Sequence, residues 1–368
     1  MPANVEAAPE PALVALLLEP AGTSMRRLAG LPVGLRLALD AQAAGIGCIV
    51  VAEQATELRA ALADARLRIP VVASAPAGAA RLRVGADWLV HRATFRELAA
   101  GLVAGDERDV RSVTQPPEVA YAFAPIELSS ESAVNRAERA LFHSLRKPQD
   151  GWTSRHLNRH ISLFISRLLI KTPLRPNQVS VAILGVGVLG ALSAAQGGYW
   201  PLVVGATLFQ SQSVLDGCDG EMSRVSHRGS RLGEWLDTIG DDLTNYGFFG
   251  GAGLGLYRWT GQELYGWAGA ICVVCGVLGS GIEYRYLIKI GSGDLLKYPL
   301  SQASSGGGLM AYIAPLFKRD TFVLLTLLAA LCGALGPMLC IFSLGAIGVL
   351  ISVLKTELRM AREAREAR

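Results

Sequence analysis

Apolar segments dominate the second half of the chain, and they constrain its fold more than any other feature. Hydrophobic residues make up 51% of the 368 residues and charged residues only 18%, and the mean hydropathy is +0.34. A helix needs about 20 apolar residues to cross a bilayer, so several of the segments, which begin after residue 178, are short or marginal. We predict six membrane-spanning helices, near residues 179–195, 201–215, 243–257, 264–282, 322–335 and 338–354.

Basic residues gather on one side of these predicted spans, after the second, fourth and sixth. They are Arg224, Arg228, Arg231, Arg285, Lys289, Lys297, Lys318, Arg319, Lys355, Arg359, Arg362, Arg365 and Arg368. The opposite loops, 196–200, 258–263 and 336–337, carry one Arg between them. Because Lys and Arg are retained on the cytoplasmic side, we expect a multi-pass protein of the cytoplasmic membrane with both termini in the cytoplasm. The N-terminus lacks a basic start followed by an apolar run, so no cleavable signal peptide is expected.

Four carboxylates stand out in this apolar half, because burying an ionised carboxylate without a cation is costly. They are Asp216, Asp219, Asp237 and Asp241. The first pair is spaced i,i+3 and the second i,i+4, so each pair projects from one helix face and the pairs can converge across a helical hairpin. Such oxygen ligands suit Mg²⁺, Mn²⁺ or Ca²⁺ better than Zn²⁺, and two such ions can clamp a pyrophosphate. The alternative, a set of helix caps and surface ion pairs, needs one carboxylate per helix rather than four.

The neighbours of these carboxylates extend the pattern. Gly220 and Gly233 let a ligand or a backbone come close, and Arg224 offers a planar guanidinium for a phosphate or a carboxylate. The full pattern, D-x-x-D-G-x-x-S-R-x8-G-x3-D-x3-D, resembles the motif of the CDP-alcohol phosphotransferase family and departs from it at Ser223, where the family usually has Ala. A match at this many fixed positions is specific.

The resemblance implies a fold and a reaction. Residues 136–357 are expected to form an all-α domain of six transmembrane helices, as a homodimer. The four aspartates would coordinate two divalent cations, Mg²⁺ or Mn²⁺, with Asp241 as the general base. The residues expected near the nucleotide are Asp219, Gly220, Ser223, Arg224 and Gly233. The implied enzyme moves a substituted phosphate from a CDP-alcohol to a hydroxyl acceptor and releases CMP; membrane lipids surround it, and no nucleic-acid partner is expected.

Two other classes of function remain open. A transporter can use carboxylates within its spans to bind a cation, but the fixed Gly and Arg positions and the placement at cytoplasmic helix ends count against it. A scaffold that has lost its activity is disfavoured because all four acidic positions are present.

The first 112 residues follow a different pattern, in which strand-like and helical runs alternate. Strands are predicted at 13–18, 46–52, 70–73 and 88–90, and helices at 34–44 and 57–65. This alternation indicates a small, cytoplasmic, Rossmann-like α/β domain, followed by a linker at 113–135. The segment 18–28 resembles a degenerate nucleotidyltransferase: it lacks the second loop glycine, no Lys follows Pro32, and His91 and Arg92 stand where that family has a metal-binding Asp. Gly22 and Arg26 remain candidates for a phosphate at a helix N-terminus.

Between the two domains, residues 136–143 are expected to form a short amphipathic helix and 152–170 a helix in the membrane interface. This region resembles the branch of the family represented by di-myo-inositol phosphate phosphate synthases. Four basic residues would bind the phosphate of an acceptor, lipid phosphates or the membrane surface: Arg155, Arg159, Lys318 and Arg319. The last residues, 358–368, are a charged C-terminal tail.

Cysteine and histidine offer weaker candidates. Cys272 and Cys275 would lie within the fourth span and are expected to pack as small apolar residues. Cys218 lies inside the motif, where it is either a reactive thiol or a space-filling residue. His156 and His160 are spaced for a metal, but the arginines around them favour a basic surface helix.

Overall fold

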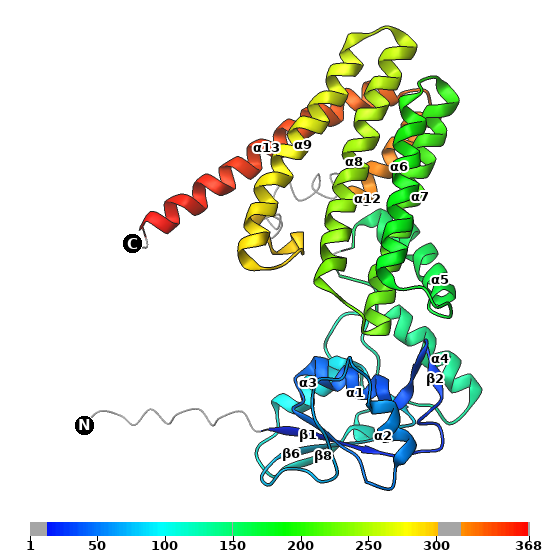
Figure 1. The fold of residues 1–368 in the computed structure, drawn as a ribbon, viewed down its shortest axis with the longest axis vertical. Coiled ribbons are helices and arrows are strands. Elements are labelled where there is room, and N and C mark those ends of the chain that lie inside the picture. Colours follow the sequence, from blue (N-terminus) through cyan, green and yellow to red (C-terminus); the bar gives the residue numbers. More distant parts are fainter. Residues whose placement is uncertain (1–12, 149, 301–317, 367–368) are drawn as a thin grey trace. The chain divides into compact units, whose positions relative to one another are not determined.

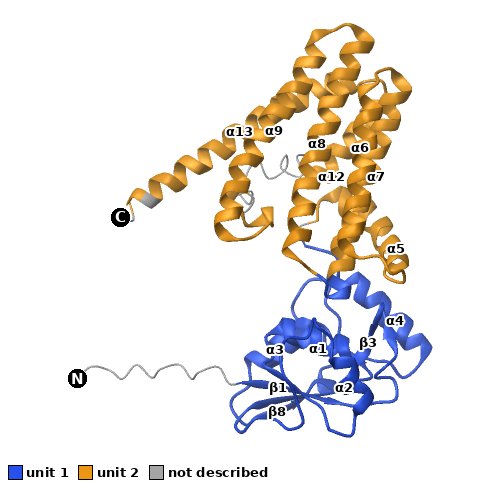
Figure 2. Cartoon of the chain, in the orientation of Figure 1, with its two compact units in different colours: residues 1–148, 224–228 blue, residues 149–223, 229–368 orange. Residues whose placement is uncertain are grey.

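The computed structural model describes residues 13–148, 150–300 and 318–366. Arg368 of the predicted basic tail and the start of the N-terminal segment lie outside the described residues. The chain divides into two compact units (Figure 2): unit 1 contains residues 1–148 and 224–228, and unit 2 contains 149–223 and 229–368.

Unit 1 is built on a five-stranded parallel sheet in the order β5-β4-β1-β6-β8. Three of its strands, β1, β6 and β8, are labelled in Figure 1. Its strands are β1 (Val14–Glu19), β4 (Cys48–Val50), β5 (Val71–Val72), β6 (Ala80–Gly85) and β8 (Glu107–Asp109). The central strand β1 pairs with β6 over its whole length, from Val14 opposite Ala80 to Glu19 opposite Gly85. A central first strand flanked by later strands on both sides is typical of doubly wound folds, so the predicted α/β class is confirmed.

The helices and short strands of unit 1 refine the prediction. The helices are α1 (Val33–Ala44), α2 (Thr56–Leu62), α3 (Arg92–Ala100) and α4 (Glu131–His143), with a 3₁₀ turn η1 (Val110–Ser112). The antiparallel pairs are β2 (Arg27–Leu28) with β3 (Leu31–Pro32) and β7 (Trp88–Leu89) with β9 (Ile126–Glu127). The predicted strand at 88–90 therefore lies outside the main sheet. The β2–β3 hairpin separates Gly22 from the start of α1.

His91 has a structural role that the sequence did not reveal. Its Nδ1 accepts a hydrogen bond from the Ala93 backbone N–H at 3.2 Å, so it caps the N-terminus of α3. Burial, and secondarily the charge of Arg92, lower the pKa of His91 to about 4, which keeps the ring neutral and able to accept this bond.

Unit 2 is helical. Its elements are a π-helical turn η2 (Ser154–Asn158), α5 (Arg159–Leu169), α6 (Pro176–Ala195), α7 (Tyr199–Ser226), α8 (Arg231–Thr260), α9 (Glu263–Ile290), a 3₁₀ turn η3 (Leu295–Lys297), α12 (Arg319–Leu331) and α13 (Leu335–Glu366). Among the described residues, three helical segments are long and apolar enough to cross a membrane: Pro176–Ala195, Glu263–Ile290 and Leu335–Glu363.

The last two predicted spans need correction at their ends. The fifth was expected to reach residue 335, but α12 ends at Leu331, where Gly333 adopts a left-handed backbone with φ 68°. Residues 336–337 were expected to be a loop, yet they lie in the first turn of α13. Pro337 is tolerated there because the backbone N–H groups of the first turn have no intrahelical acceptor. The charged tail continues α13 as helix as far as Glu366.

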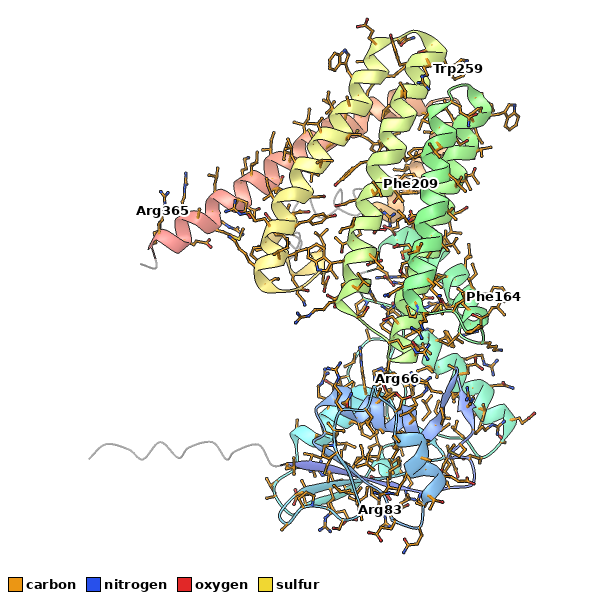
Figure 3. The ribbon with its side chains drawn as sticks, viewed as in Figure 1. Arg66, Arg83, Phe164, Phe209, Trp259 and Arg365 are labelled. Carbon is orange, nitrogen blue, oxygen red and sulfur yellow. The ribbon has the colours of Figure 1, made fainter. Side chains whose placement is uncertain are left out.

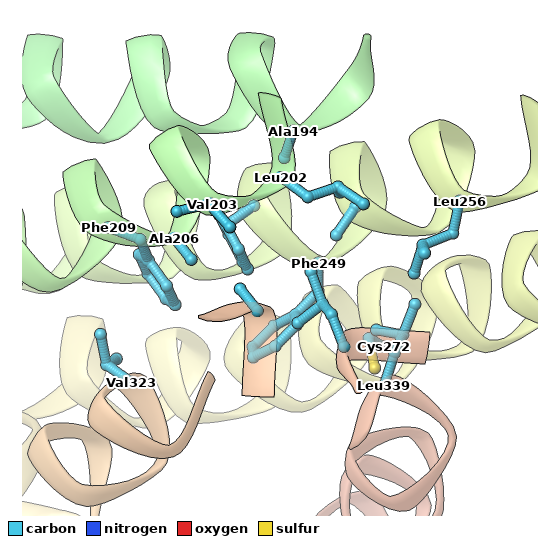
Figure 4. Close-up of a cluster of buried hydrophobic side chains, with 14 of the residues drawn as sticks. Ala194, Leu202, Val203, Ala206, Phe209, Phe249, Leu256, Cys272, Val323 and Leu339 are labelled. Carbon is cyan, nitrogen blue, oxygen red and sulfur yellow. The ribbon is translucent and has the colours of Figure 1, made fainter. Parts of the chain in front are cut away.

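Small residues let the helices of unit 2 approach closely. A Cβ added at Gly205 would lie 2.8 Å from the Gly190 carbonyl oxygen, and one added at Gly253 would lie 2.7 Å from the Gly269 Cα. These contacts join α6 to α7 and α8 to α9, as in membrane helix pairs, where small residues replace the hydrophobic effect as the source of tight packing. A cluster of buried apolar side chains fills the space among α7, α8, α9, α12 and α13 (Figure 4). Phe209 and Phe248 stack within this cluster, with ring centroids 4.5 Å apart.

Large apolar side chains also cover the outside of unit 2 (Figure 3). Trp200 is 71% exposed, Trp267 65% and Leu344 70%. Exposed apolar surface of this kind is typical of a surface that contacts a membrane or another protein. The helices are therefore built to meet an apolar environment.

Candidate active site

The four motif carboxylates lie on two consecutive helices of unit 2. Asp216 and Asp219 are on α7, and Asp237 and Asp241 are on α8. The turn between the helices is short because Ser230 caps α8: its side chain accepts the Gly233 N–H at 3.0 Å. Both helices continue past the ends of the predicted apolar spans, as the polar ends of those spans indicated.

Arg319, the first residue of α12, brings α7 and α8 together at these carboxylates. Its Nη1 lies 2.6 Å from Asp241 Oδ1 and 3.3 Å from Asp216 Oδ2. Its Nη2 donates to Gln212 Oε1 at 2.6 Å, and its Nε donates to Asn245 Oδ1 at 3.3 Å. One guanidinium therefore bridges carboxylates from both halves of the motif. We call Asp216, Asp219, Asp237, Asp241 and Arg319 the carboxylate site.

The other two carboxylates are positioned differently. Asp219 is buried, and its Oδ2 accepts a short hydrogen bond from Ser180 on α6, while its Oδ1 accepts the Gly220 N–H at 2.5 Å. Asp237 lies one turn before Asp241 on α8. Gly233, in the first turn of α8, faces α6: an added Cβ would lie 3.2 Å from Asn177 Oδ1.

The carboxylate site suits a hard divalent cation. Within the described residues, no three acidic, histidine or cysteine side chains are arranged to hold an ion, so the metal ligands remain a prediction. Two observations nevertheless favour a cation here. A guanidinium already lies between Asp216 and Asp241 as a stand-in for positive charge. Asp241 Oδ1 is buried, and its contact with Arg319 is an ion pair without hydrogen-bond geometry. A carboxylate oxygen in this position, among other oxygen donors, fits Mg²⁺ or Mn²⁺.

A second arginine and carboxylate cluster, which the sequence did not predict, lies on the other side of α7. Glu221 is fully buried and accepts hydrogen bonds from Arg159 Nη1 at 2.7 Å, Ser162 Oγ at 2.8 Å and Ser166 Oγ at 2.6 Å. Arg159 also donates to both carboxylate oxygens of Asp150, at 2.9 and 3.0 Å. We call Asp150, Arg159, Ser162, Ser166 and Glu221 the buried network. The sequence signal that could have predicted this cluster is Glu221 itself. It is a glutamate within the motif, between Gly220 and Ser223, on the face of α7 opposite the motif aspartates.

The four basic residues proposed for an acceptor phosphate thus have different surroundings. Arg159 belongs to the buried network and Arg319 to the carboxylate site. Arg155 lies on the exposed side of η2, with Nη2 3.5 Å from the Asp150 carbonyl oxygen, and Lys318 immediately precedes α12. The hydrogen bonds and charges of Asp150 and Glu221 raise the pKa of Arg159 despite the opposing effect of burial, so its guanidinium stays charged.

Two further motif neighbours are now placed. Cys218 is fully buried, and burial raises the pKa of its thiol to about 12, so it fills space and is not a reactive thiolate. Asp242, next to Asp241, accepts hydrogen bonds from Ser280 and from Tyr284, the latter at 2.6 Å, which ties α8 to α9. Arg224 and Ser223 lie in the last turn of α7, and Arg224 is counted with unit 1.

Comparison with known proteins finds a family match within the helical region. The family model described as CDP-alcohol phosphatidyltransferase matches residues 174–354. The chain is 36% identical over 123 residues to a "Bifunctional IPC transferase and DIPP synthase" from Thermococcus kodakarensis, covering 33% of this chain and 27% of the relative. A protein of the same name from Rubrobacter xylanophilus is 41% identical over 128 residues, which is 34% of this chain and 28% of that protein. The chain thus spans about a quarter of the length of the curated relatives it matches.

Among solved structures, the chain is similar to a phosphatidylinositol phosphate synthase of Mycobacterium tuberculosis with CDP-DAG bound. The sequence identity is 20% and the TM-score is 0.41, over 54% of this chain and 93% of that chain. The apo form of the same protein gives a TM-score of 0.40 at 21% identity.

Proposed function

We propose that the chain transfers a substituted phosphate from a CDP-alcohol to a hydroxyl acceptor and releases CMP, because residues 174–354 match the family model described as CDP-alcohol phosphatidyltransferase. The main observation behind this proposal is that Arg319 contacts Asp216 on α7 and Asp241 on α8 at the same time. Both halves of the motif therefore meet at one positively charged group. A pyrophosphate donor needs positive charge held in place by carboxylates at such a site.

In the proposed reaction, the acceptor oxygen bonds to the phosphorus of the donor while the bond from that phosphorus to the CMP oxygen breaks. Asp241 takes the proton of the acceptor hydroxyl on a carboxylate oxygen. Two divalent cations, held by Asp216, Asp219, Asp237 and Asp241, would neutralise charge on the pyrophosphate. Ser180 fixes the rotamer of Asp219 through its hydrogen bond. Gly220, Ser223, Arg224 and Gly233 complete the proposed nucleotide contacts.

The topology is part of the proposal. Each predicted span overlaps one helix among α6, α7, α8, α9, α12 and α13, which supports a six-helix membrane domain. The basic residues at the ends of α7, α9 and α13 support an active site and both termini on the cytoplasmic side of the inner membrane. A homodimer surrounded by membrane lipids is proposed from the family resemblance.

The proposed acceptor is an inositol phosphate. Relatives named for DIPP synthase activity favour this type of acceptor over an unphosphorylated or lipid alcohol. Of the four basic residues, Arg155 and Lys318 are proposed as the first phosphate contacts. Arg319 would join them once a metal ion takes its place between the carboxylates. Arg159 would have to leave two carboxylates within a buried network, so it is proposed to act on the acceptor only indirectly.

Residues 1–112 are proposed to be a noncatalytic module. The lysine and the metal-binding aspartate that nucleotidyl transfer needs are missing, and His91 serves as a helix cap instead. The full chain, given CTP and inositol phosphate with Mg²⁺, should release no pyrophosphate. Measurable release would make the chain bifunctional.

The test of the main proposal is CMP release by the purified full chain in detergent, with a CDP-alcohol, inositol phosphate and Mg²⁺. CMP should form only when both the metal and the acceptor are present. The same protein in vesicles should move no cation against a gradient; cation transport without CMP would favour the transporter and contradict the proposal.

A further inference from the structure

The interfacial segment from Gly151 to α5 makes polar contacts with two helices of the carboxylate site. Through Arg159, Ser162 and Ser166 it holds Glu221 on α7. At its start, the Ser154 backbone N–H donates to Asp320 Oδ2 at 2.6 Å. Asp320 follows Arg319 directly on α12. The segment thus contacts Asp320, which is next to Arg319 on α12, and Glu221, which is on α7 with the site aspartates.

Both carboxylate oxygens of Glu221 accept hydrogen bonds within the buried network. Glu221 Oε1 accepts from Arg159 and Ser162, and Oε2 accepts from Ser166. Arg159 also donates through Nε and Nη2 to Asp150, and the side chains of both residues are only 9% exposed. A buried ion pair of this kind contributes little net stability, because desolvation offsets the attraction. Its geometry, however, is fixed by several charge-assisted hydrogen bonds, so it specifies one arrangement of α5 against α7.

The contacts with α5 lie on the face of α7 opposite the motif carboxylates. Successive helical residues turn by about 100°, which places Gly217, Cys218 and Glu221 on one face and Asp216 with Asp219 roughly opposite. All three residues of the first face meet α5. Cys218 Sγ lies 3.6 Å from the Ser162 carbonyl oxygen, and a Cβ added at Gly217 would lie 3.1 Å from Arg159 Nη1. Any rotation of α7 about its axis would break these contacts and turn the carboxylates away from α8.

The contact with α12 is equally close. A Cβ added at Gly151 would collide with the carboxylate of Asp320, so glycine is needed for the chain to approach it. Thr153 Oγ1 and Thr321 Oγ1 lie 3.4 Å apart beside it. The N-terminal turn of α12, which carries Arg319, is therefore tied to the start of η2 and α5.

We propose that Glu221 and Asp320 are positioning residues for the carboxylate site. They attach α7 and α12 to one brace, η2 with α5, and so fix Asp216 and Asp219 relative to Arg319 and the α8 carboxylates. The proposal rests on the phosphotransferase function for its kinetic consequence, but the brace itself is a property of the fold. Neither residue contacts substrate in this account.

The test compares Glu221→Gln with the exposed, isosteric control Glu263→Gln in the purified full chain. Glu221→Gln keeps the side-chain volume and removes the charge that orders Arg159 and the two serines. We expect kcat for CMP release to fall about 10- to 100-fold, as for residues that orient metal ligands, with the KM of the CDP-alcohol within about twofold of wild type. Mn²⁺ affinity should fall by a similar factor, and amide hydrogen exchange should increase in α5 and in residues 214–223. The control should change none of these values.

Ser166→Ala covers the case in which Glu221→Gln does not fold, because it removes one hydrogen bond and leaves every charge paired. It should shift Mn²⁺ affinity and exchange in the same direction, by less. The inference is overturned if Glu221→Gln or Ser166→Ala folds with wild-type Mn²⁺ affinity and exchange, or if kcat falls only in proportion to the folded fraction. If the wild type itself releases no CMP, the proposed function fails, and the Mn²⁺ and exchange measurements still decide on the brace.

Discussion

The carboxylate site and the buried network contact opposite faces of α7, and each combines carboxylates with one arginine from another helix. The two clusters differ in their exposure to solvent and in their hydrogen bonds. In the buried network the carboxylate of Glu221 is inaccessible to solvent and accepts three hydrogen bonds. In the carboxylate site Asp216 and Asp241 keep 27% and 26% of their side-chain surface exposed and share one guanidinium. The motif residues of α7 lie on the face of the carboxylate site, whereas Glu221 occupies a position that the motif leaves unspecified, so the motif alone does not reveal the buried network.

This difference separates a structural role from a chemical one. Glu221 is closed to solvent and both of its carboxylate oxygens already accept hydrogen bonds, so a ligand would have to displace existing bonds. A partly exposed pair of carboxylates with an imperfect ion pair can exchange its arginine for a metal ion without leaving a buried charge unpaired. The buried network should therefore control stability and position, and the carboxylate site should control metal binding and turnover.

The largest expected effect is on turnover. Asp237→Asn removes a proposed metal ligand with almost no change in volume, so CMP release should fall by about 10³-fold or more while the protein stays folded. Asp294→Asn, at the start of η3 and outside the site, is the matched control and should keep normal turnover. Near-normal turnover in Asp237→Asn would remove the two-metal hypothesis.

Stability should respond to the other cluster. Arg159→Met leaves Glu221 and Asp150 buried without their cation, which should lower the free energy of unfolding by about 3 to 5 kcal/mol. Arg319→Met, in the presence of Mg²⁺, should cost less than about 1 kcal/mol, because its carboxylates are partly exposed and bind metal instead. Denaturation in detergent, followed by circular dichroism, measures both. Equal losses would abolish the distinction between the clusters.

The acceptor site should show a smaller, selective effect. Lys318→Gln or Arg155→Gln should raise the KM of inositol phosphate but leave that of the CDP-alcohol unchanged, because each removes a charge-assisted contact worth about 1.5 to 3 kcal/mol. If these residues only attract the membrane surface, both KM values should stay constant, since each contributes about 1 kcal/mol to lipid attraction. Steady-state kinetics with each candidate acceptor decides.

The finest test uses one hydroxyl from each cluster. Ser162→Ala removes a hydrogen bond to Glu221 and should lower stability by about 1 kcal/mol, whereas Ser180→Ala removes one to Asp219 and should affect Mn²⁺ affinity more than stability. Thermal unfolding and Mn²⁺ titration on both variants give the comparison. Interchanged effects would mean that the two faces have the opposite roles.

The sequence predicted the parts of this account that depend on local pattern. Apolar runs predicted the regions of the six helices, and the motif spacing predicted the four aspartates as metal ligands, which stays a prediction. In unit 1, β6 was missed because Arg81 and Arg83 alternate with Leu82 and Val84, so only its buried face is apolar. The short β8 carries three charged residues and has no apolar signal at all.

Contacts between residues far apart in the sequence could not be predicted from local patterns. Arg319 was assigned to an acceptor phosphate because a basic residue near a membrane surface has many uses, and nothing local indicates that it reaches Asp216, 103 positions earlier in the chain. Arg159 was assigned to the same site for the same reason, although its partner Glu221 lies within the motif. A charged residue facing the apolar side of a helix is the signal to look for in such sequences.

Direct titration of the purified chain with Mn²⁺, followed by electron paramagnetic resonance, tests the central claim that the exposed face of α7 holds the metal and the buried face does not. The account predicts about two bound ions per chain, lost in Asp216→Asn and retained with weaker affinity in Glu221→Gln. Binding that is unchanged in Asp216→Asn would contradict it.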